Sequence, residues 1–505
     1  MRSTKSRVVR GVEGALVVLL FLCGSAGVSS GQAGAEAIDA PTLMEIVREL
    51  CRPELDGRLP GSKGYDKAAA YAAAWFERLG LRPAGDQGYF QYLDVEYNEL
   101  LSPPRLAILS AGGQVVRECV LGKEFVARGF SGSGKVTAPV VFCGYGLSCP
   151  EHGYDDYAGV DVRGKVVLAF KQPPAWQPPG ANWGERALPR PKAEAARRRG
   201  ARALLLVSCP NSQPVQRPIG SVMHGPGEQQ DIPQLHIDVA LADEMLADAG
   251  VNLAALQAVI DSTHMPRSFP LRTKVRVEVR ARYAKAKRTM NVVALLPGSD
   301  PQVQEECVVI GAHLDHVGRQ SPEVYYPGAN DNASGSAAVM AIAKAFAQAS
   351  SRPRRSIVFA LFASEEQGML GADAYASRPP FPLERTVAML NLDCIGTGDS
   401  VAVYGGVDFS ELFALVQEQD RLHTRLLSAA TGGGGGADAG PFHRRGVPNL
   451  YFATTNSYEH LHLPSDRPET LRPELFTAAA RLAFLTARVL ADGAAIGSHQ
   501  ERAQP

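Results

Sequence analysis

The chain has 505 residues, too many for one compact domain, and this length predicts two or three domains. Apolar residues make up 45% of it, enough for hydrophobic cores, while 52 basic and 52 acidic side chains cancel in net charge. This balance gives no indication of a strongly basic protein, so neither nucleic acid nor an anionic membrane surface is expected as a partner.

Residues 1–35 have the pattern of an export signal. Basic residues precede a short apolar run at 15–23, and the small residues Ala33-Gly34-Ala35 then provide a cleavage site. We predict a signal peptide over 1–35 and a mature protein exported to the periplasm or the extracellular space, with no stable membrane span. An uncleaved anchor helix is the alternative, but the apolar run is short for a span. Lipid modification of Cys23 is disfavoured by the large Leu22 before it.

Seven cysteines follow Cys23, and none forms a C-x-x-C pair. Export permits disulfides, and Cys143 and Cys149 are the pair nearest in sequence. The odd number leaves at least one thiol unpaired or bonded to another chain. Buried, unreactive cysteines are the default interpretation.

The N-terminal part of the mature chain predicts helices at 40–50 and 66–79, separated by the Gly- and Pro-rich loop DGRLPGSKGY. Residues 87–127 then alternate between apolar and polar side chains as strands do.

From about residue 129, strand-like runs lie among glycines, prolines and short helical segments. We interpret residues 129–265 as a small β-rich domain inserted into the first domain. The first domain then comprises 36–128 and 266–495, and residues 496–505 form a disordered tail. Such insertions are common because the ends of a domain segment often lie close together.

Apolar, strand-like runs and helical patterns alternate in the C-terminal half. The runs lie at 308–312, 357–363, 387–392 and 447–453, and the helical patterns at 333–349, 409–419 and 474–490. Continuous apolar runs are typical of parallel strands covered on both faces. The pattern predicts an α/β fold, a three-layer sandwich with a largely parallel mixed sheet.

Histidines and carboxylates follow these runs. The candidate metal ligands are His313, Asp331, Glu366, Asp393 and His462. Ligand sites of open α/β sheets lie beyond the carboxyl ends of the strands. Nitrogen and carboxylate donors without cysteine suit zinc or a similar divalent ion. Five donors are too many for one tetrahedral site and suit two metals that share a bridging carboxylate.

Two further acidic residues are candidate catalytic groups. Asp315 lies two residues after His313, where it can orient that imidazole. Glu365 adjoins Glu366, and neighbours in an extended segment point in opposite directions. One glutamate would face the metal and the other the attacking water, which makes Glu365 the general base.

Taken singly, each of these residues also has an interpretation without catalytic or metal-binding function. A single histidine after a strand is more often a satisfied polar residue, a Glu-Glu pair is usually solvated, and Asp393 alone could cap a helix. The recurrence of such residues at successive strand ends of one α/β region favours the functional interpretation.

Five phrases contain these candidate residues: His313-Leu-Asp315, Gly328-Ala-Asn-Asp331-Asn-Ala-Ser-Gly335, Ser364-Glu365-Glu366, Asn391-Leu-Asp393 and His462-Leu-Pro-Ser-Asp466. In order and spacing they resemble the motifs of the family 28 zinc metallopeptidases, which are mostly two-zinc aminopeptidases. The resemblance spans about 290–490, and the segment 55–80 resembles the family's N-terminal part. The phrases GYGL, DYAGVDVRGKVVL and RRRGARALLLVS of the inserted region resemble a protease-associated domain.

The resemblance implies a role for each residue. Asp331 would bridge two zinc ions per chain, with His313 and Asp393 completing one site and Glu366 and His462 the other. It also implies Glu365 as base and proton shuttle, Asp315 as support for His313, and a cis peptide bond at Asp331–Asn332.

The roles of several other residues near the motifs are less definite. The H-x-P-x-D phrase favours His462 over His460 as the ligand, and we interpret His316 as a supporting or pocket-wall residue. Asn332 stands where many family members have a second Asp. Asp438 is retained in a segment that often reads Ser-Asp-His, but alanines flank it, which puts the substrate pocket there in doubt.

The sequence therefore predicts an exported zinc aminopeptidase that removes N-terminal residues from peptides. A carboxypeptidase, a dipeptidase or a glutaminyl cyclase on the same fold is the first alternative, and two bound metals would argue against the single-metal cyclase. An inactive, receptor-like binding domain is the second, disfavoured because every expected ligand is present.

Overall fold

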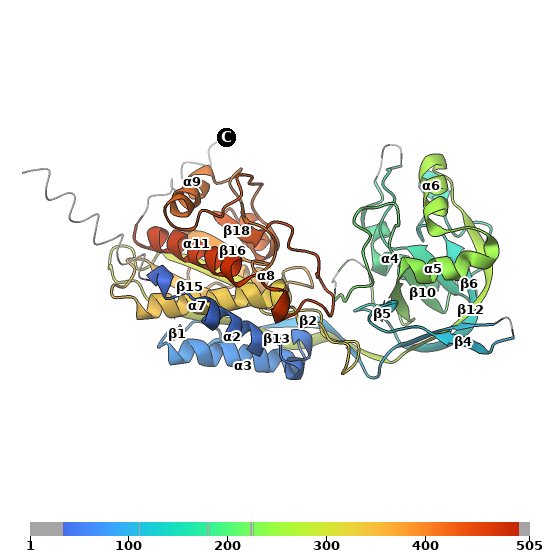
Figure 1. Ribbon diagram of the computed structural model, residues 1–505, viewed down its shortest axis with the longest axis horizontal. Coiled ribbons are helices and arrows are strands. Elements are labelled where there is room, and N and C mark those ends of the chain that lie inside the picture. The colour runs from blue at the N-terminus through green and yellow to red at the C-terminus, as the bar shows by residue number, and fades with distance from the viewer. Residues whose placement is uncertain are drawn as a thin grey trace, which may run out of the picture.

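The structure is a computed structural model that describes residues 34–493 except 111, 179, 181, 223, 224 and 226. Nearly all of the predicted signal peptide and the whole predicted tail, 496–505, lie outside the described residues. Within the described part, no helix is both long and apolar enough to cross a membrane. Two eight-stranded sheets divide the molecule into two lobes, which lie side by side in Figure 1.

The first lobe is built on a mixed sheet. Its strand order is β1 (Arg82–Pro83), β13 (Ala281–Leu296), β15 (Ser356–Phe362), β14 (Cys307–His313), β16 (Thr386–Leu392), β18 (Asn449–Thr454) and β17 (Val401–Tyr404), with β2 (Phe90–Leu100) paired to β13. The four central strands, β15, β14, β16 and β18, run parallel. Strands β1, β2, β13 and β17 are antiparallel to their neighbours. The predicted mixed sheet is confirmed, and it is parallel at its four central strands, whereas four of its seven strand pairings are antiparallel.

Helices cover both faces of this sheet, which completes the predicted three layers. One face packs against α2 (Ala40–Leu50), α3 (Lys63–Arg78), α7 (Gly335–Gln348), α9 (Ser410–Gln419) and α11 (Pro473–Ala491), and the other against α8 (Leu370–Ser377) and α10 (Gly440–His443). In β14, Val308 and Ile310 contribute to the first core and Cys307 and Val309 to the second. This alternation is why the strand reads as an unbroken apolar run.

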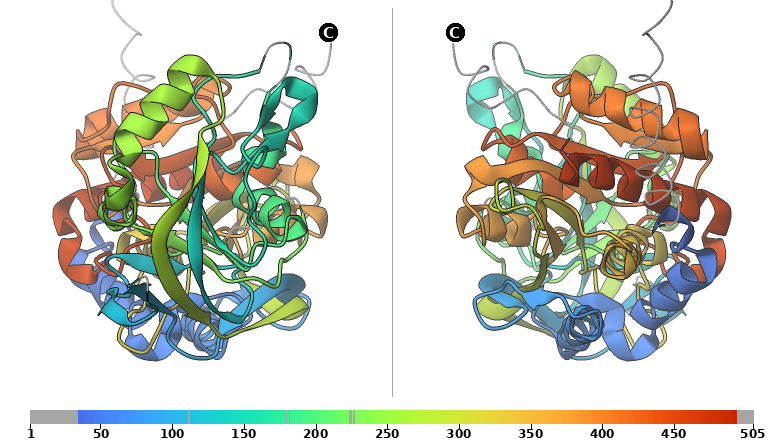
Figure 2. Two further views of the ribbon diagram at one scale, coloured as in Figure 1. Left: turned by 90° about the vertical axis from the view of Figure 1, so that its right-hand side faces the viewer. Right: turned by 90° about the vertical axis from the view of Figure 1, so that its left-hand side faces the viewer.

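The second lobe has its own mixed sheet and core. Its strand order is β4 (Val115–Glu118), β3 (Arg105–Leu109), β12 (Ser268–Val279), β6 (Gly134–Cys143), β9 (Val166–Phe170), β10 (Ala203–Val207), β11 (Gln234–Ile237) and β5 (Phe125–Ala127). Its helices are α4 (Pro189–Arg198), α5 (Val239–Leu246) and α6 (Leu253–Thr263), and the short strands β7 (Ser148–Cys149) and β8 (Tyr154–Asp155) pair separately. Each lobe's helices pack around its own sheet (Figure 2).

The second lobe extends beyond the expected limits of 129 and 265. Strands β3, β4 and β5 precede residue 129, and β12 follows residue 265, yet all four belong to the second sheet. Alternating side chains identify a strand but not the strand with which it pairs. Strand β12 pairs with β3 on one side and with β6 on the other, and these pairings place it in the second sheet. Only Arg280 separates β12 from β13, so one extended run passes from one sheet to the other.

The seven cysteines of the described part form no disulfide, and all but the partly exposed Cys119 are buried. Cys143 and Cys149 are both unpaired. Burial raises the pKa of the Cys143 thiol, which keeps it protonated and unreactive at neutral pH. The default interpretation of buried, unreactive thiols is the one that the structure supports.

Candidate metal centre

Three neighbouring parallel strands end at the site. Strand β14 ends at His313, β15 ends three residues before Glu365, and β16 ends directly before Asp393. Because β15 and β16 flank β14 in parallel, their carboxyl ends bring these side chains to one edge of the sheet. The loop after β18 supplies His462.

The structure brings all five predicted ligands together, in two groups that share one residue. One group is His313, Asp331 and Asp393, and the other is His316, Asp331, Glu366 and His462. Within each group the donor atoms lie within 4.8 Å of one another, close enough to hold a metal ion. Asp331 belongs to both groups, the position expected for a bridging carboxylate.

The first group contains buried polar atoms that lack a partner. His313 Nε2 lies 3.4 Å from Asp331 Oδ1 and 3.4 Å from Asp393 Oδ1. Neither His313 Nε2 nor Asp393 Oδ1 has a hydrogen-bond partner among the described residues, although both are buried. Unpartnered buried polar atoms are costly, and a cation bound between them would satisfy both. This donor set therefore fits zinc.

The second group is tighter. His462 Nε2 lies 3.1 Å from Asp331 Oδ2 and 2.9 Å from Glu366 Oε2. His316 Nδ1 lies 2.9 Å from Glu366 Oε1, so His316 is a fourth donor of this group rather than only a wall of the pocket. His460 is outside both groups and bonds to Ser465 at 3.1 Å, in agreement with the preference for His462.

The loop that carries Asp331 is held by Asp466 and Asn332, whose roles the sequence did not indicate. The Asp331–Asn332 peptide bond is cis, as the resemblance implied. The Asp466 carboxylate accepts the N–H groups of Asn330 at 2.8 Å and Asp331 at 3.1 Å. The Asn332 amide donates to the Leu392 carbonyl at 2.9 Å, so Asn332, in place of the more usual Asp, ties the loop to the residue before Asp393.

The two adjacent glutamates lie in a turn, which corrects the expectation of an extended segment. Strand β15 ends at Phe362, and Ser364 has a positive φ of 60° that turns the chain before Glu365. Only Glu366 belongs to a donor group, so the two side chains still have different surroundings. The local turn, and not strand alternation, gives the two glutamates their different surroundings.

Asp315 holds this turn. Its carboxylate accepts the N–H of Glu365 at 3.1 Å and that of Glu366 at 3.3 Å. His313 Nδ1 lies 3.2 Å from the Asp315 carbonyl oxygen and 3.7 Å from its carboxylate. Asp315 therefore orients His313 mainly through its main chain, while its side chain positions both glutamates.

The electrostatic surroundings of the two glutamates are opposite. Burial raises the pKa of Glu365 well above its ordinary value, and the negative charges of Asp438 and Glu366 raise it further. Burial would also raise the pKa of Glu366, but the His462 charge and hydrogen bonds from His316 and His462 lower it to about 2. Glu366 is thus a stable anion suited to a cation, whereas Glu365 is suited to carry a proton.

Asp438 is the acidic residue near the site whose role the sequence left open. It is fully buried, and neither of its carboxylate oxygens has a hydrogen-bond partner among the described residues. Burial raises its pKa well above the ordinary value, with Asp315 and Asp393 contributing. Its alanine neighbours supply no polar partner, so Asp438 borders the site without belonging to either donor group.

The second lobe touches the site through Gly220, in the loop between β10 and β11. His462 Nδ1 lies 3.3 Å from the Gly220 carbonyl oxygen, and the Gly220 N–H donates to the His462 carbonyl at 3.0 Å. When His462 Nδ1–H donates to this carbonyl, Nε2 stays free for the donor group. No pattern in the sequence indicated this contact, because the two residues are 242 positions apart.

Replacing Gly220 with Ala should weaken metal binding at the His462 group by about 10–100-fold, the range found for outer partners of metal ligands. A Cβ at Gly220 would lie 2.6 Å from Val317 and 2.9 Å from the Tyr326 ring, so the loop must shift and its contact with His462 is disturbed. Competition with a chelator, followed by elemental analysis, measures the change.

Gly225→Ala in the same loop is the matched control, because a Cβ there meets nothing within 4 Å. Equal metal affinity in Gly220→Ala and Gly225→Ala would show that the Gly220 contact does not support His462.

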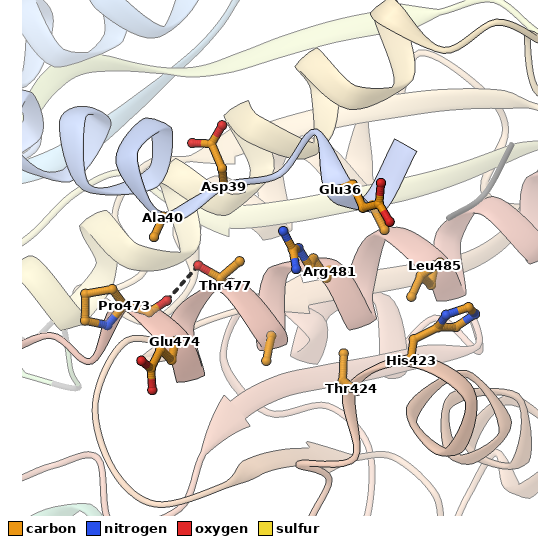
Figure 3. A pocket seen from close by; sticks show the side chains of 12 residues that line it. Glu36, Asp39, Ala40, His423, Thr424, Pro473, Glu474, Thr477, Arg481 and Leu485 are labelled. Carbon is orange, nitrogen blue, oxygen red and sulfur yellow. Dashed lines mark hydrogen bonds between the residues drawn. The ribbon is translucent and has the colours of Figure 1, made fainter. Parts of the chain in front are cut away.

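A cavity of about 490 Å³ lies away from these residues, between the start of α2 and α11 (Figure 3). Arg481, Glu474 and His423 line it, and the Thr477 hydroxyl donates to the Pro473 carbonyl at 2.6 Å. It contains none of the predicted site residues, so it is not the candidate active site.

Comparison with known proteins gives a match to a peptidase family and a similar fold. Residues 291–487 match the sequence model described as peptidase family M28. The fold resembles a peptidase M28 precursor from Shewanella amazonensis, with a TM-score of 0.65 and 21% identity over 93% of this chain and 97% of that one. It also resembles an aminopeptidase from Aneurinibacillus sp. strain AM-1, with a TM-score of 0.62 and 20% identity over 92% and 96% of the two chains.

Sequence similarity to curated proteins is more local. A probable leucine aminopeptidase of Arthroderma otae is 27% identical over 200 residues, which are 38% of this chain and 55% of that protein. The chain thus spans about half the length of this relative.

Proposed function

Residues 291–487 belong to peptidase family M28, and from this premise we propose that the protein is a zinc-dependent aminopeptidase. The observation that carries the proposal is the pair of donor groups joined by Asp331. The two carboxylate oxygens of Asp331 lie near different histidines, Oδ1 near His313 and Oδ2 near His462. This arrangement supports two co-catalytic zinc ions, one per group. Aminopeptidases among the relatives and structural neighbours support the N-terminal specificity.

Bound zinc would polarise the scissile carbonyl and make a water molecule more acidic. Glu365 takes the proton from the attacking water and passes it to the leaving amine, a role for which its raised pKa is suitable. Asp315 holds the main chain of Glu365 in place through a hydrogen bond of 3.1 Å. Glu366 remains anionic in its donor group and takes no part in the proton transfer.

We also propose that the protein is exported and that the second lobe restricts the site to short peptides. The N-terminal pattern of basic, apolar and small residues supports export. The contact between Gly220 and His462 supports the position of the second lobe at the edge of the site.

Peptide amides with a free N-terminus should be hydrolysed at least about tenfold faster than their N-acetylated forms, because an aminopeptidase binds the free amine through a charge that acetylation removes. Activity assays on matched pairs, with elemental analysis of the same dialysed sample, measure both the specificity and the metal content.

Amidated peptides keep the comparison independent of the C-terminus. A carboxypeptidase would leave these amides intact whether or not they were acetylated, and a glutaminyl cyclase would act on N-terminal glutamine and contain one metal. Either result would replace the aminopeptidase assignment.

A further inference from the structure

Arg128 is a buried cation without a partner. The residue is 5% exposed, and its Nη1 is buried and lacks a hydrogen-bond partner. Its guanidinium forms no hydrogen bond or ion pair with any residue that the structure describes. Burial of an unpaired charge is costly, and desolvation lowers the pKa of Arg128 to about 10. An anion bound beside Arg128 would offset this cost.

The residues around Arg128 are basic as well. Arg128 directly follows β5, whose Ala127 pairs with Leu235 of β11 in the core of the second lobe. Side chains alternate along a strand, so Arg128 and His236 project from the opposite face of the sheet. Burial and the Arg128 charge lower the pKa of Lys171 to about 7, and Lys171 donates to Gln216.

His236 completes the basic cluster in its neutral form. Burial, with the charges of Lys171 and Arg128, keeps the pKa of His236 well below its ordinary value. Its Nδ1 accepts the Ile219 N–H at 3.3 Å, and its Nε2 lies 3.0 Å from the Ser208 hydroxyl. Since His236 is neutral and the pKa of Lys171 is about 7, Arg128 is the residue of this cluster that keeps a full positive charge at neutral pH, and its buried Nη1 has no partner among the described residues.

Arg128 lines a cavity of about 590 Å³ at the junction of the lobes. The other arginines on its wall are already paired: Arg319 Nη1 lies 2.7 Å from an Asp56 carboxylate oxygen, and Arg282 pairs with Glu99. Arg128 is therefore the guanidinium of this cavity that is free to bind a ligand.

The cavity wall continues into the loop that touches the metal centre. Ser221 and Val222 line the cavity and directly follow Gly220, which contacts His462. The Tyr326 ring packs against Gly220, and its buried hydroxyl also lacks a hydrogen-bond partner. The region thus contains two unsatisfied polar groups, one cationic and one a hydroxyl, both suited to a carboxylate.

We propose that this cavity binds a small carboxylate, held by the Arg128 guanidinium, at the junction between the two lobes. The carboxylate has two possible sources, a free organic anion or the C-terminus of a bound peptide. A bound carboxylate neutralises the Arg128 charge, and this stabilises both the junction between the lobes and the loop that carries Gly220.

Acetate is the probe for the site itself, and melting temperature is the readout, which does not depend on the proposed enzymatic function. Saturating acetate should raise the melting temperature of the wild-type protein by about 2 °C or more. Arg128→Met removes the charge at similar volume and should abolish this rise. In acetate-free buffer it should melt no lower than the wild type, because the unpaired buried charge is gone.

Arg282→Met, on the same cavity but at a paired arginine, is the matched control and should retain the acetate response. Arg128→Lys keeps the charge and should retain part of the acetate response. This result would show that Arg128→Met loses the response through loss of charge and not through misfolding. All measurements use equal ionic strength.

The source of the carboxylate is tested with peptides that differ only in a free or amidated C-terminus. If the peptide supplies it, the free form should have a KM at least about tenfold lower in the wild type, and Arg128→Met should remove the difference. If KM is equal while acetate still stabilises the wild type, the ligand is a free anion. If neither acetate nor the peptide carboxylate distinguishes the wild type from Arg128→Met, the proposal is wrong, whatever the enzymatic function.

Discussion

Replacing Glu365 with Gln should lower the turnover number by about 10²–10⁴-fold, the contribution typical of a positioned acid–base group. The change keeps the size of the side chain and the main-chain hydrogen bond to Asp315 but removes the proton acceptor. Because Glu365 belongs to neither donor group, the metal content should not change, and KM should change little. Steady-state kinetics and elemental analysis on the same sample measure all three quantities.

Glu366→Gln is the matched comparison, one residue along the same turn. It replaces an anionic donor, 2.9 Å from His462 Nε2, with a neutral one, so one metal should bind loosely. Excess zinc should then restore part of the activity, which it cannot do for Glu365→Gln. Loss of metal from Glu365→Gln, with full retention in Glu366→Gln, would reverse the two roles.

Asp331→Asn should lower the affinity for both metals and reduce activity by more than about 100-fold, the upper range for residues that only support a ligand. The reason is that its two oxygens serve different groups, 3.4 Å from His313 Nε2 and 3.1 Å from His462 Nε2. An amide offers one oxygen and no charge, so it cannot balance two cations. Metal content after dialysis against a weak chelator measures the loss.

Asp393→Asn is the control, because Asp393 belongs only to the His313 group. It should lose one metal and keep the other. If Asp331→Asn also keeps one metal with undiminished affinity, the carboxylate does not bridge and the two groups act independently.

The sequence was sufficient to predict the layers of the first lobe and to select five candidate ligands that the structure brings together. Parallel strands covered on both faces read as continuous apolar runs, and their carboxyl ends meet at one edge of the sheet. Residues next to those ends, such as His313 and Asp393, can therefore be located without knowing any long-range contact.

Only the tertiary structure decided which other side chains complete the site. His316, Asp466 and Gly220 act through partners that lie 50, 135 and 242 positions away in the sequence. No local pattern encodes such contacts, because they depend on how separate loops pack. The limits of the second lobe have the same cause: alternation along β12 reveals a strand, whereas its pairing with β3 and β6 assigns it to a sheet.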